Sequence, residues 1–397
     1  MAKFKKQLNI IFSGISGSIG KDNPQETLAK ELHKYNAVSN KVDFGVLYNA
    51  LMEKNLGQDI ADRQCFKDIV VMGDSGGFQV ITGKVPSGDI EVLKKEVYKH
   101  QAKNADYGFC FDVEPTNNGF YDHNLALKKT LETNGNIKKQ IEVFKEIKTE
   151  CRIFPIAKVQ PEDRAVSYEN LLKDCDVTMI AGMGANTRIF GELFAYPFFF
   201  KEFQQKAGFP NVLHHLGAGT PSTILPFYLL AKEGFFGEDF VYSVDATSYS
   251  HSLILRSTIC KEDGKIAKMA DLTDSEFEGW KNYCLQNMPE LCEGKEAFHN
   301  LNRHQTLSVK GGLFKVFIIS SLSYAMKMFL KMVEDPYKFA ADNEILTYHQ
   351  LQSIKELAKC RGWNDYYAWK GVFSGVWEKV NPRKVKPLER SSLDAFF

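Results

Sequence analysis

Short apolar runs recur along the chain and alternate with charged stretches of helical spacing. A run such as DIVVMGD (68–74) has the β-branched residues typical of a strand that is buried on both faces. The apolar runs cover residues 8–12, 68–74, 107–115, 152–160, 176–184, 211–221 and 240–248, and helical spacing is clearest in 89–105, 134–149 and 220–234. This alternation predicts a parallel sheet. Seven runs, plus an eighth strand that the pattern does not locate, fit a (βα)8 TIM-like barrel. A doubly wound open sheet is the alternative.

The alternation stops between about residues 260 and 300, where the chain is polar and contains several cysteines. We therefore predict an inserted small subdomain, followed by a C-terminal helical extension. The predicted parts are the main part of the barrel (1–260), the inserted cysteine-containing subdomain (261–304), the last barrel helices (305–340) and a helical, basic extension (341–397). The most apolar segment, 313–330, is interrupted by lysines and serines, which predicts a buried helix and not a membrane span.

The bulk composition is that of a globular protein without a membrane partner. The net charge is only +1, so a nucleic acid would have to be held by a local basic surface. The eight cysteines lack the dense spacing of a secreted disulfide scaffold. They predict reduced thiols and a cytoplasmic location.

Polar or glycine-rich residues follow several of the predicted strands. In a barrel these strand ends converge on one mouth, where ligands bind. The residues are Asp74, Asp112, Gln160, Gly182, Gly184, Gly217, Gly219 and Asp245. Three carboxylates, beside glycines that let a ligand approach the backbone, predict a pocket for a flat polar ligand and for acid/base or nucleophilic chemistry. The alternative is that each aspartate caps the next helix, and that Asp-Ser-Gly-Gly is only a turn.

The order and spacing of these motifs resemble the tRNA-guanine transglycosylase superfamily. The motifs are DSGGFQV (74–80), FDVEP (111–115), AGMGA (181–185), LGAGTP (216–221) and VDATSYS (244–250). The resemblance covers roughly residues 40–300 and is most specific in DSGGFQ. It implies a (βα) barrel with a zinc subdomain and the exchange of a guanine in a polynucleotide for a 7-deazaguanine.

The resemblance also implies roles for individual residues. Asp245 would be the nucleophile that attacks the sugar, and Asp74 the general acid/base that exchanges a proton with the base. The implied substrate-binding residues are Asp112, Ser75, Gly76, Phe78, Gln160, Gly182, Met183, Gly184 and Leu216. Phe78 and Leu216 would enclose the base, although Phe78 reads equally well as a core aromatic under the loop. No organic cofactor is expected.

The zinc motif of the family is altered in this chain, because the regular Cys-x-Cys-x2-Cys spacing is absent. The candidate ligands of one structural Zn²⁺ are Cys260, Cys284, Cys292 and His299. The alternative is an insert without metal, in which the cysteines are simply buried.

No motif shows directly whether the nucleic acid is DNA or RNA. Altered zinc spacing with both aspartates present resembles the divergent members of phages and bacterial genomic islands, which insert a 7-deazaguanine such as preQ0 into DNA. DNA is therefore the leading partner and tRNA the alternative, while a non-catalytic nucleic-acid-binding subunit is a third hypothesis. A second copy of the chain or a helper protein is a candidate partner. In the extension, Trp363, Trp369 and Trp377 could stack on bases, or they could pack a terminal helix pair.

Overall fold

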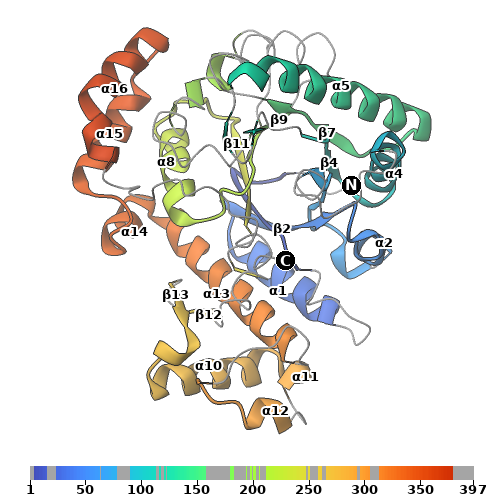
Figure 1. Ribbon diagram of the computed structural model, residues 1–397. Helices are drawn as coiled ribbons and strands as arrows, with labels where there is room; N and C mark the ends of the chain where they lie inside the picture. Colours follow the sequence, from blue (N-terminus) through green and yellow to red (C-terminus); the bar gives the residue numbers. More distant parts are fainter. Residues whose placement is uncertain are drawn as a thin grey trace.

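A nearly closed, barrel-like layer of parallel strands with helices around it forms the centre of the molecule (Figure 1). The computed structural model describes residues 4–15, 24–62, 64–77, 90–112, 116–117, 120–121, 123–157, 179–182, 194, 197–198, 200–202, 205, 212–246, 249–250, 258–261, 265–292, 296–304 and 313–378.

Each strand of the central sheet pairs in parallel with its neighbours in the sheet. The strands are β1 (Leu8–Phe12), β2 (Val42–Asn49), β3 (Val71–Asp74), β4 (Tyr107–Phe109), β7 (Arg152–Phe154), β8 (Ile156–Ala157), β9 (Met179–Gly182), β10 (Val212–His215) and β11 (Val241–Ala246). Their order is β7-β4-β3-β2-β1-β11-β10-β9-β8. Only Pro155 separates β7 from β8, so one stretch of chain forms both ends of this order. The sheet is therefore barrel-like, and the open-sheet alternative is wrong.

The strand that the sequence pattern did not locate is β2. It was missed because Asp43 and Gly45 are residue types that are depleted in strands. A Cβ at position 45 would lie 2.6 Å from the carbonyl oxygen of Val70, so the packing of β2 against β3 requires glycine there. Asp43 is tolerated because it forms an ion pair with Lys6 at 2.6 Å.

Helices surround the sheet as the alternation predicted. They are α1 (Pro24–Val38), α2 (Lys54–Ala61), α4 (Ile90–Asn104), α5 (His123–Ile147), α8 (Pro221–Lys232) and α13 (Phe314–Glu334). The 3-10 turns η2 (Gln64–Phe66) and η4 (Met269–Asp271) and the small pair β5 (Thr116–Asn117) and β6 (Phe120–Tyr121) complete the connections. Helix α13 has the length and hydropathy of a membrane span, but most of its apolar stretch is buried inside the protein. The prediction of a buried helix there is confirmed.

The chain between β11 and α13 forms elements of its own, which lie at one side of the barrel in Figure 1. They are β12 (Thr258–Cys260), its antiparallel partner β13 (Ile266–Lys268), α10 (Asp274–Asn287), α11 (Pro289–Cys292) and α12 (Glu296–His299). Trp280 of α10 stacks on Phe317 of α13, with 4.8 Å between the ring centroids, and its Nε1 donates to Ser320 Oγ. An apolar contact of this kind attaches these elements to α13.

The helices after α13 are α14 (Pro336–Asp342), α15 (Tyr348–Ala358) and α16 (Trp363–Glu378). Trp369 and Trp377 of α16 are buried, and their indole N–H groups donate to the carbonyl and the hydroxyl of Ser353. These two rings pack the helix pair and cannot stack on bases, so the stacking hypothesis is wrong for them. Trp363 is half-buried and donates to Glu202, and the basic residues after 378 lie outside the described residues.

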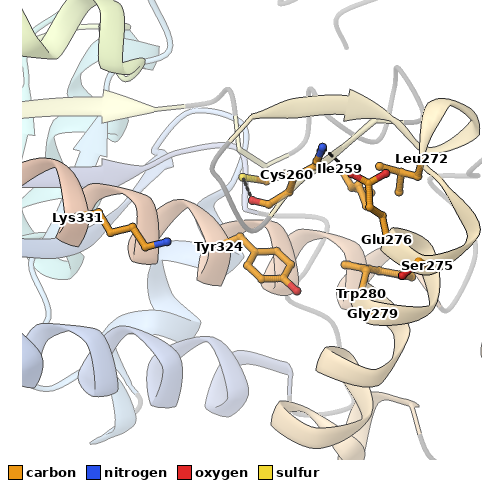
Figure 2. A pocket seen from close by; sticks show the side chains of 10 residues that line it. Ile259, Cys260, Leu272, Ser275, Glu276, Gly279, Trp280, Tyr324 and Lys331 are labelled. Atoms are coloured by element: carbon orange, nitrogen blue, oxygen red, sulfur yellow. Dashed lines mark hydrogen bonds and ion pairs between the residues drawn. The ribbon is translucent and has the colours of Figure 1, made fainter. Parts of the chain in front are cut away.

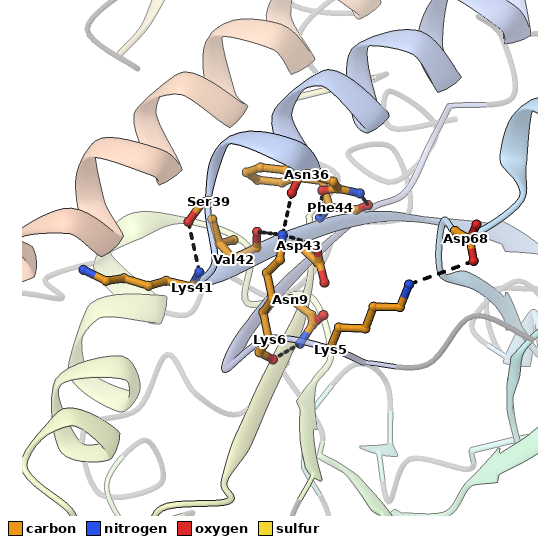
Figure 3. A network of polar contacts seen from close by, with 10 residues as sticks. All are labelled: Lys5, Lys6, Asn9, Asn36, Ser39, Lys41, Val42, Asp43, Phe44 and Asp68. Carbon is orange, nitrogen blue, oxygen red and sulfur yellow. Dashed lines mark hydrogen bonds and ion pairs between the residues drawn. The ribbon is translucent and has the colours of Figure 1, made fainter.

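A polar network lies near the starts of β1 and β2, at the amino-terminal end of the barrel (Figure 3). Lys6 Nζ contacts Asp43 at 2.6 Å and also donates to the carbonyl oxygens of Asn36 and Val42. The side chains of Lys6 and Asp43 are only 14% and 15% exposed, so water screens this pair weakly. Lys5 and Asp68 nearby are 3.9 Å apart and mostly exposed.

Replacing Lys6 with Met should lower the free energy of unfolding by about 2–3 kcal/mol, because it leaves the Asp43 carboxylate without its cation. The matched change Lys5→Met should cost about 0.5 kcal/mol or less, since the pair that it breaks is exposed. Urea unfolding of both variants measures the difference. Equal losses would contradict a structural role for the Lys6 pair.

Candidate active site

Asp74 is the last residue of β3 and lies at the carboxyl end of the barrel. The backbone N–H of Gly76 donates to its Oδ2 at 3.2 Å. Gly76 has φ +76°, and a Cβ there would lie 2.6 Å from Leu51 Cβ, so only glycine can bring this N–H to the carboxylate without strain. Ser75 is buried and accepts the N–H of Gly77. The Asp-Ser-Gly-Gly turn therefore serves to hold the carboxyl group.

Asp245 lies on β11, next to the final residue of that strand. Its Oδ1 accepts the backbone N–H of Gly217 at 2.5 Å. Gly217 has φ +65°, and Gly219 packs so closely on β11 that a Cβ there would lie 2.1 Å from Ala246 Cβ. The glycines of LGAGTP thus bring the turn after β10 against the Asp245 carboxylate.

The charge of Asp245 influences the carboxyl group of Asp74. Removal of water from the Asp74 carboxyl, together with the negative charge of Asp245, raises the pKa of Asp74 to about 6, although the N–H groups of Gly76 and Ser75 act in the opposite direction. A carboxyl group with this pKa can both donate and accept a proton near neutral pH.

Asp112 follows β4 at the same end of the barrel. Its Oδ1 accepts from Thr133 Oγ1 at 3.4 Å, and a Cβ on Gly77 would lie 3.1 Å from its carbonyl oxygen. The segments after β3 and β4 are therefore in close contact.

Other predicted site residues also lie at strand ends. Gly182 ends β9, and the half-buried Leu216 follows β10. Four predicted site residues, Phe78, Gln160, Met183 and Gly184, lie outside the described residues.

Two side chains without a predicted role contact the aspartates. Asn49, the last residue of β2, has Nδ2 3.5 Å from Asp74 Oδ2, while its Oδ1 accepts the N–H groups of Leu51 and Met52. His214 of β10 has Nε2 3.5 Å from Asp245 Oδ1. A polar residue at the end of an apolar strand was the available signal for Asn49, but β2 itself was not located. His214 lies inside its strand, where the sequence does not reveal its partner.

The candidate zinc ligands do not form a cluster. Among the described residues, no three His, Cys, Asp or Glu side chains are grouped as metal ligands. Cys260, Cys284 and Cys292 are buried, whereas His299 is exposed. Burial, followed by the proximity of Cys292, raises the pKa of the Cys284 thiol. Zinc stays a sequence prediction.

A cavity of about 540 Å³ lies beside the elements that follow β11 (Figure 2). Its walls come from β12, α10 and α13 and include Lys261, Trp280 and Tyr324. Lys261 pairs with Glu276 at 2.7 Å across this region. Neither Asp74 nor Asp245 lines the cavity, so it is separate from the aspartate site.

Two comparisons with known proteins give no match. A scan against the models of known protein families gives no match for this chain, and a search of curated proteins finds none that is significantly similar. The family resemblance therefore rests on the sequence motifs alone.

Replacing Gly219 with Ala should destabilise the protein by about 3 kcal/mol, because the new methyl group would meet the backbone of β11. Gly217→Ala is the control: nothing lies within 4 Å of its Cβ position, so only the positive φ costs about 1–2 kcal/mol. Urea unfolding compares the two variants. A Gly219→Ala protein as stable as the wild type would contradict the close packing on β11.

Replacing Asp74 with Asn should stabilise the protein above pH 6. The pKa of Asp74 rises from its usual 3.8 to about 6 on folding, so the folded state binds more protons and wild-type stability falls as the pH rises through this range. Asn carries no charge, and we expect a gain of about 1–2 kcal/mol at pH 8 that disappears below pH 4. Urea unfolding at pH 4 and pH 8 measures it. A loss of stability at pH 8 would contradict this pKa.

Proposed function

We propose that this protein is a base-exchange transglycosylase that replaces guanine in DNA with a 7-deazaguanine such as preQ0. The observation that supports this most is the pair of aspartates at one end of the barrel. Asp245 is held by a backbone N–H, and Asp74 has a pKa of about 6 beside it. A nucleophile must be ionised, whereas an acid/base group must change its protonation state near neutral pH.

The reaction has two steps. Asp245 forms a bond to the anomeric carbon of the nucleotide while the bond from that carbon to guanine breaks, and Asp74 gives a proton to the departing base. The incoming base then gives a proton to Asp74 and displaces Asp245, which restores both carboxyl groups. Asp112, which only accepts hydrogen bonds when ionised, would bind the N–H edge of the base.

DNA is the proposed polynucleotide because the zinc motif is irregular in the sequence. This spacing departs from the pattern that the tRNA enzymes of this family share. A guanine inside duplex DNA must leave the base stack before Asp245 can reach its sugar, which costs a few kcal/mol. A helper protein or a second copy of the chain could assist this opening, and the alternative substrate is tRNA.

The first experiment is incorporation of labelled guanine or preQ0 into duplex DNA, single-stranded DNA and unmodified tRNA, tested in parallel with the purified protein. Label in DNA supports the proposal, and label in tRNA alone favours the tRNA reaction. If no nucleic acid is labelled, base exchange by the isolated chain is refuted and a non-catalytic binding subunit becomes the better hypothesis.

Replacing Asp245 with Asn should abolish the covalent protein–DNA adduct, because the amide cannot act as the nucleophile. Denaturing electrophoresis with labelled DNA detects the adduct. Asp239→Asn is the matched control, since Asp239 is exposed just before the amino end of β11, and it should leave the adduct unchanged. An adduct that still forms in the Asp245→Asn variant would refute the assignment of Asp245 as the nucleophile.

A further inference from the structure

His214 lies inside the barrel directly beside Asp245. Its side chain is fully buried, and its ring lies against Phe109 and Phe154, with ring centroids 5.0 and 5.6 Å away. Nδ1 is 2.9 Å from Ser243 Oγ, and Nε2 is 3.5 Å from Asp245 Oδ1. Ser243 and Asp245 are two residues apart on β11, so both face the same side of the strand. The imidazole therefore links these two side chains.

The partners of the ring determine which nitrogen carries the proton. An ionised carboxylate has no proton to donate, so the nitrogen that faces Asp245 must be the N–H donor. Nδ1 then accepts the hydroxyl proton of Ser243, which stabilises this tautomer. The Nε2 atom is buried and has no closer hydrogen-bond partner among the described residues. A buried N–H without a full hydrogen bond costs free energy, which favours a closer approach to the carboxylate.

We propose that His214 is a positioning residue for the nucleophile. This inference rests on the proposed function and deepens it. The Gly217 N–H donates to Oδ1 of Asp245, and His214 Nε2 lies 3.5 Å from the same oxygen. Oδ2 is therefore the oxygen that remains to attack the sugar. An approach from 3.5 Å to full hydrogen-bond distance on substrate binding is the tightening expected of catalytic hydrogen bonds.

The two donors act most strongly when Asp245 leaves the sugar. In the first step Oδ2 bonds to the anomeric carbon, and the electron pair of the broken bond goes to the base, which takes the proton of Asp74. In the second step the carbon–Oδ2 bond breaks and its electron pair returns to the carboxylate. The returning charge is shared with Oδ1, where Gly217 and His214 stabilise it.

The kinetic test compares His214→Phe with His214→Gln. Phe keeps the aromatic contact with Phe109 and Phe154 but removes the donor, while the Gln amide can still donate to Asp245. We expect His214→Phe to slow adduct formation and its turnover by about 10- to 100-fold with an unchanged KM for the free base, and His214→Gln to recover part of this loss. The proposal would be overturned if His214→Phe formed the adduct as fast as the wild type. It would also be overturned if His214→Gln, at the same melting temperature, formed the adduct no faster than His214→Phe.

The matched control is His215→Phe. His215 is also buried on β10, but its ring contacts Phe227 of α8 and its Nδ1 lies 3.1 Å from the Tyr242 hydroxyl, away from Asp245. This variant should cost stability without slowing the adduct steps. A loss of rate as large as that of His214→Phe would show a general packing effect and refute the specific role.

A spectroscopic test examines the contact between His214 and Asp245 without an activity assay. Nitrogen-15 NMR of histidine-labelled protein should show that His214 carries its proton on Nε2 and none on Nδ1. The Asp245→Asn variant should shift the Nε2 signal of His214 but not that of His215. A proton on Nδ1 would overturn the proposal. If the wild-type protein labels no nucleic acid, the proposed function fails, and this spectrum still decides whether His214 donates to Asp245.

Discussion

Closure of the parallel sheet is the constraint on which the site depends. A parallel sheet leaves unpaired backbone groups at its two edges unless the edges meet. Here β7 pairs with β4, and β8, one residue further along the chain, pairs with β9, so a single stretch interrupted by Pro155 completes the ring. The register then places Asp245 opposite Ile11, and Asp74 opposite Asn49. Both carboxylates consequently lie at the carboxyl end of the same barrel.

The same closure explains the polar interior. His214 and Ser243 face one another across neighbouring strands where an ordinary core would hold apolar side chains. A buried polar group is costly unless it has a partner, and the mutual contact reduces that cost. Asn9 on β1 is also buried and donates to the Lys6 carbonyl near the base of the barrel. The interior is therefore apolar enough to pack and also places polar side chains beside Asp245.

The environments of the two aspartates differ, which supports the two proposed chemical roles. Asp245 accepts a short hydrogen bond from the Gly217 backbone. Asp74 has lost much of its hydration beside another negative charge, which favours the protonated form. Separate environments for two carboxyl groups are the usual means by which one site contains both an ionised group and a proton donor.

The sequence by itself determined the alternation of strands and helices, the buried helix α13 and the positions of Asp74 and Asp245 after apolar runs. These features depend on local periodicity, which is visible in a linear chain. Only the tertiary structure located β2. Asp43 is accommodated there by its ion pair with Lys6, and Gly45 by its close packing on Val70, and neither contact is visible in the sequence. The tertiary structure also brought His214 to Asp245. Such contacts join residues that are distant along the chain, and their geometry arises only when the strands pair and the barrel closes.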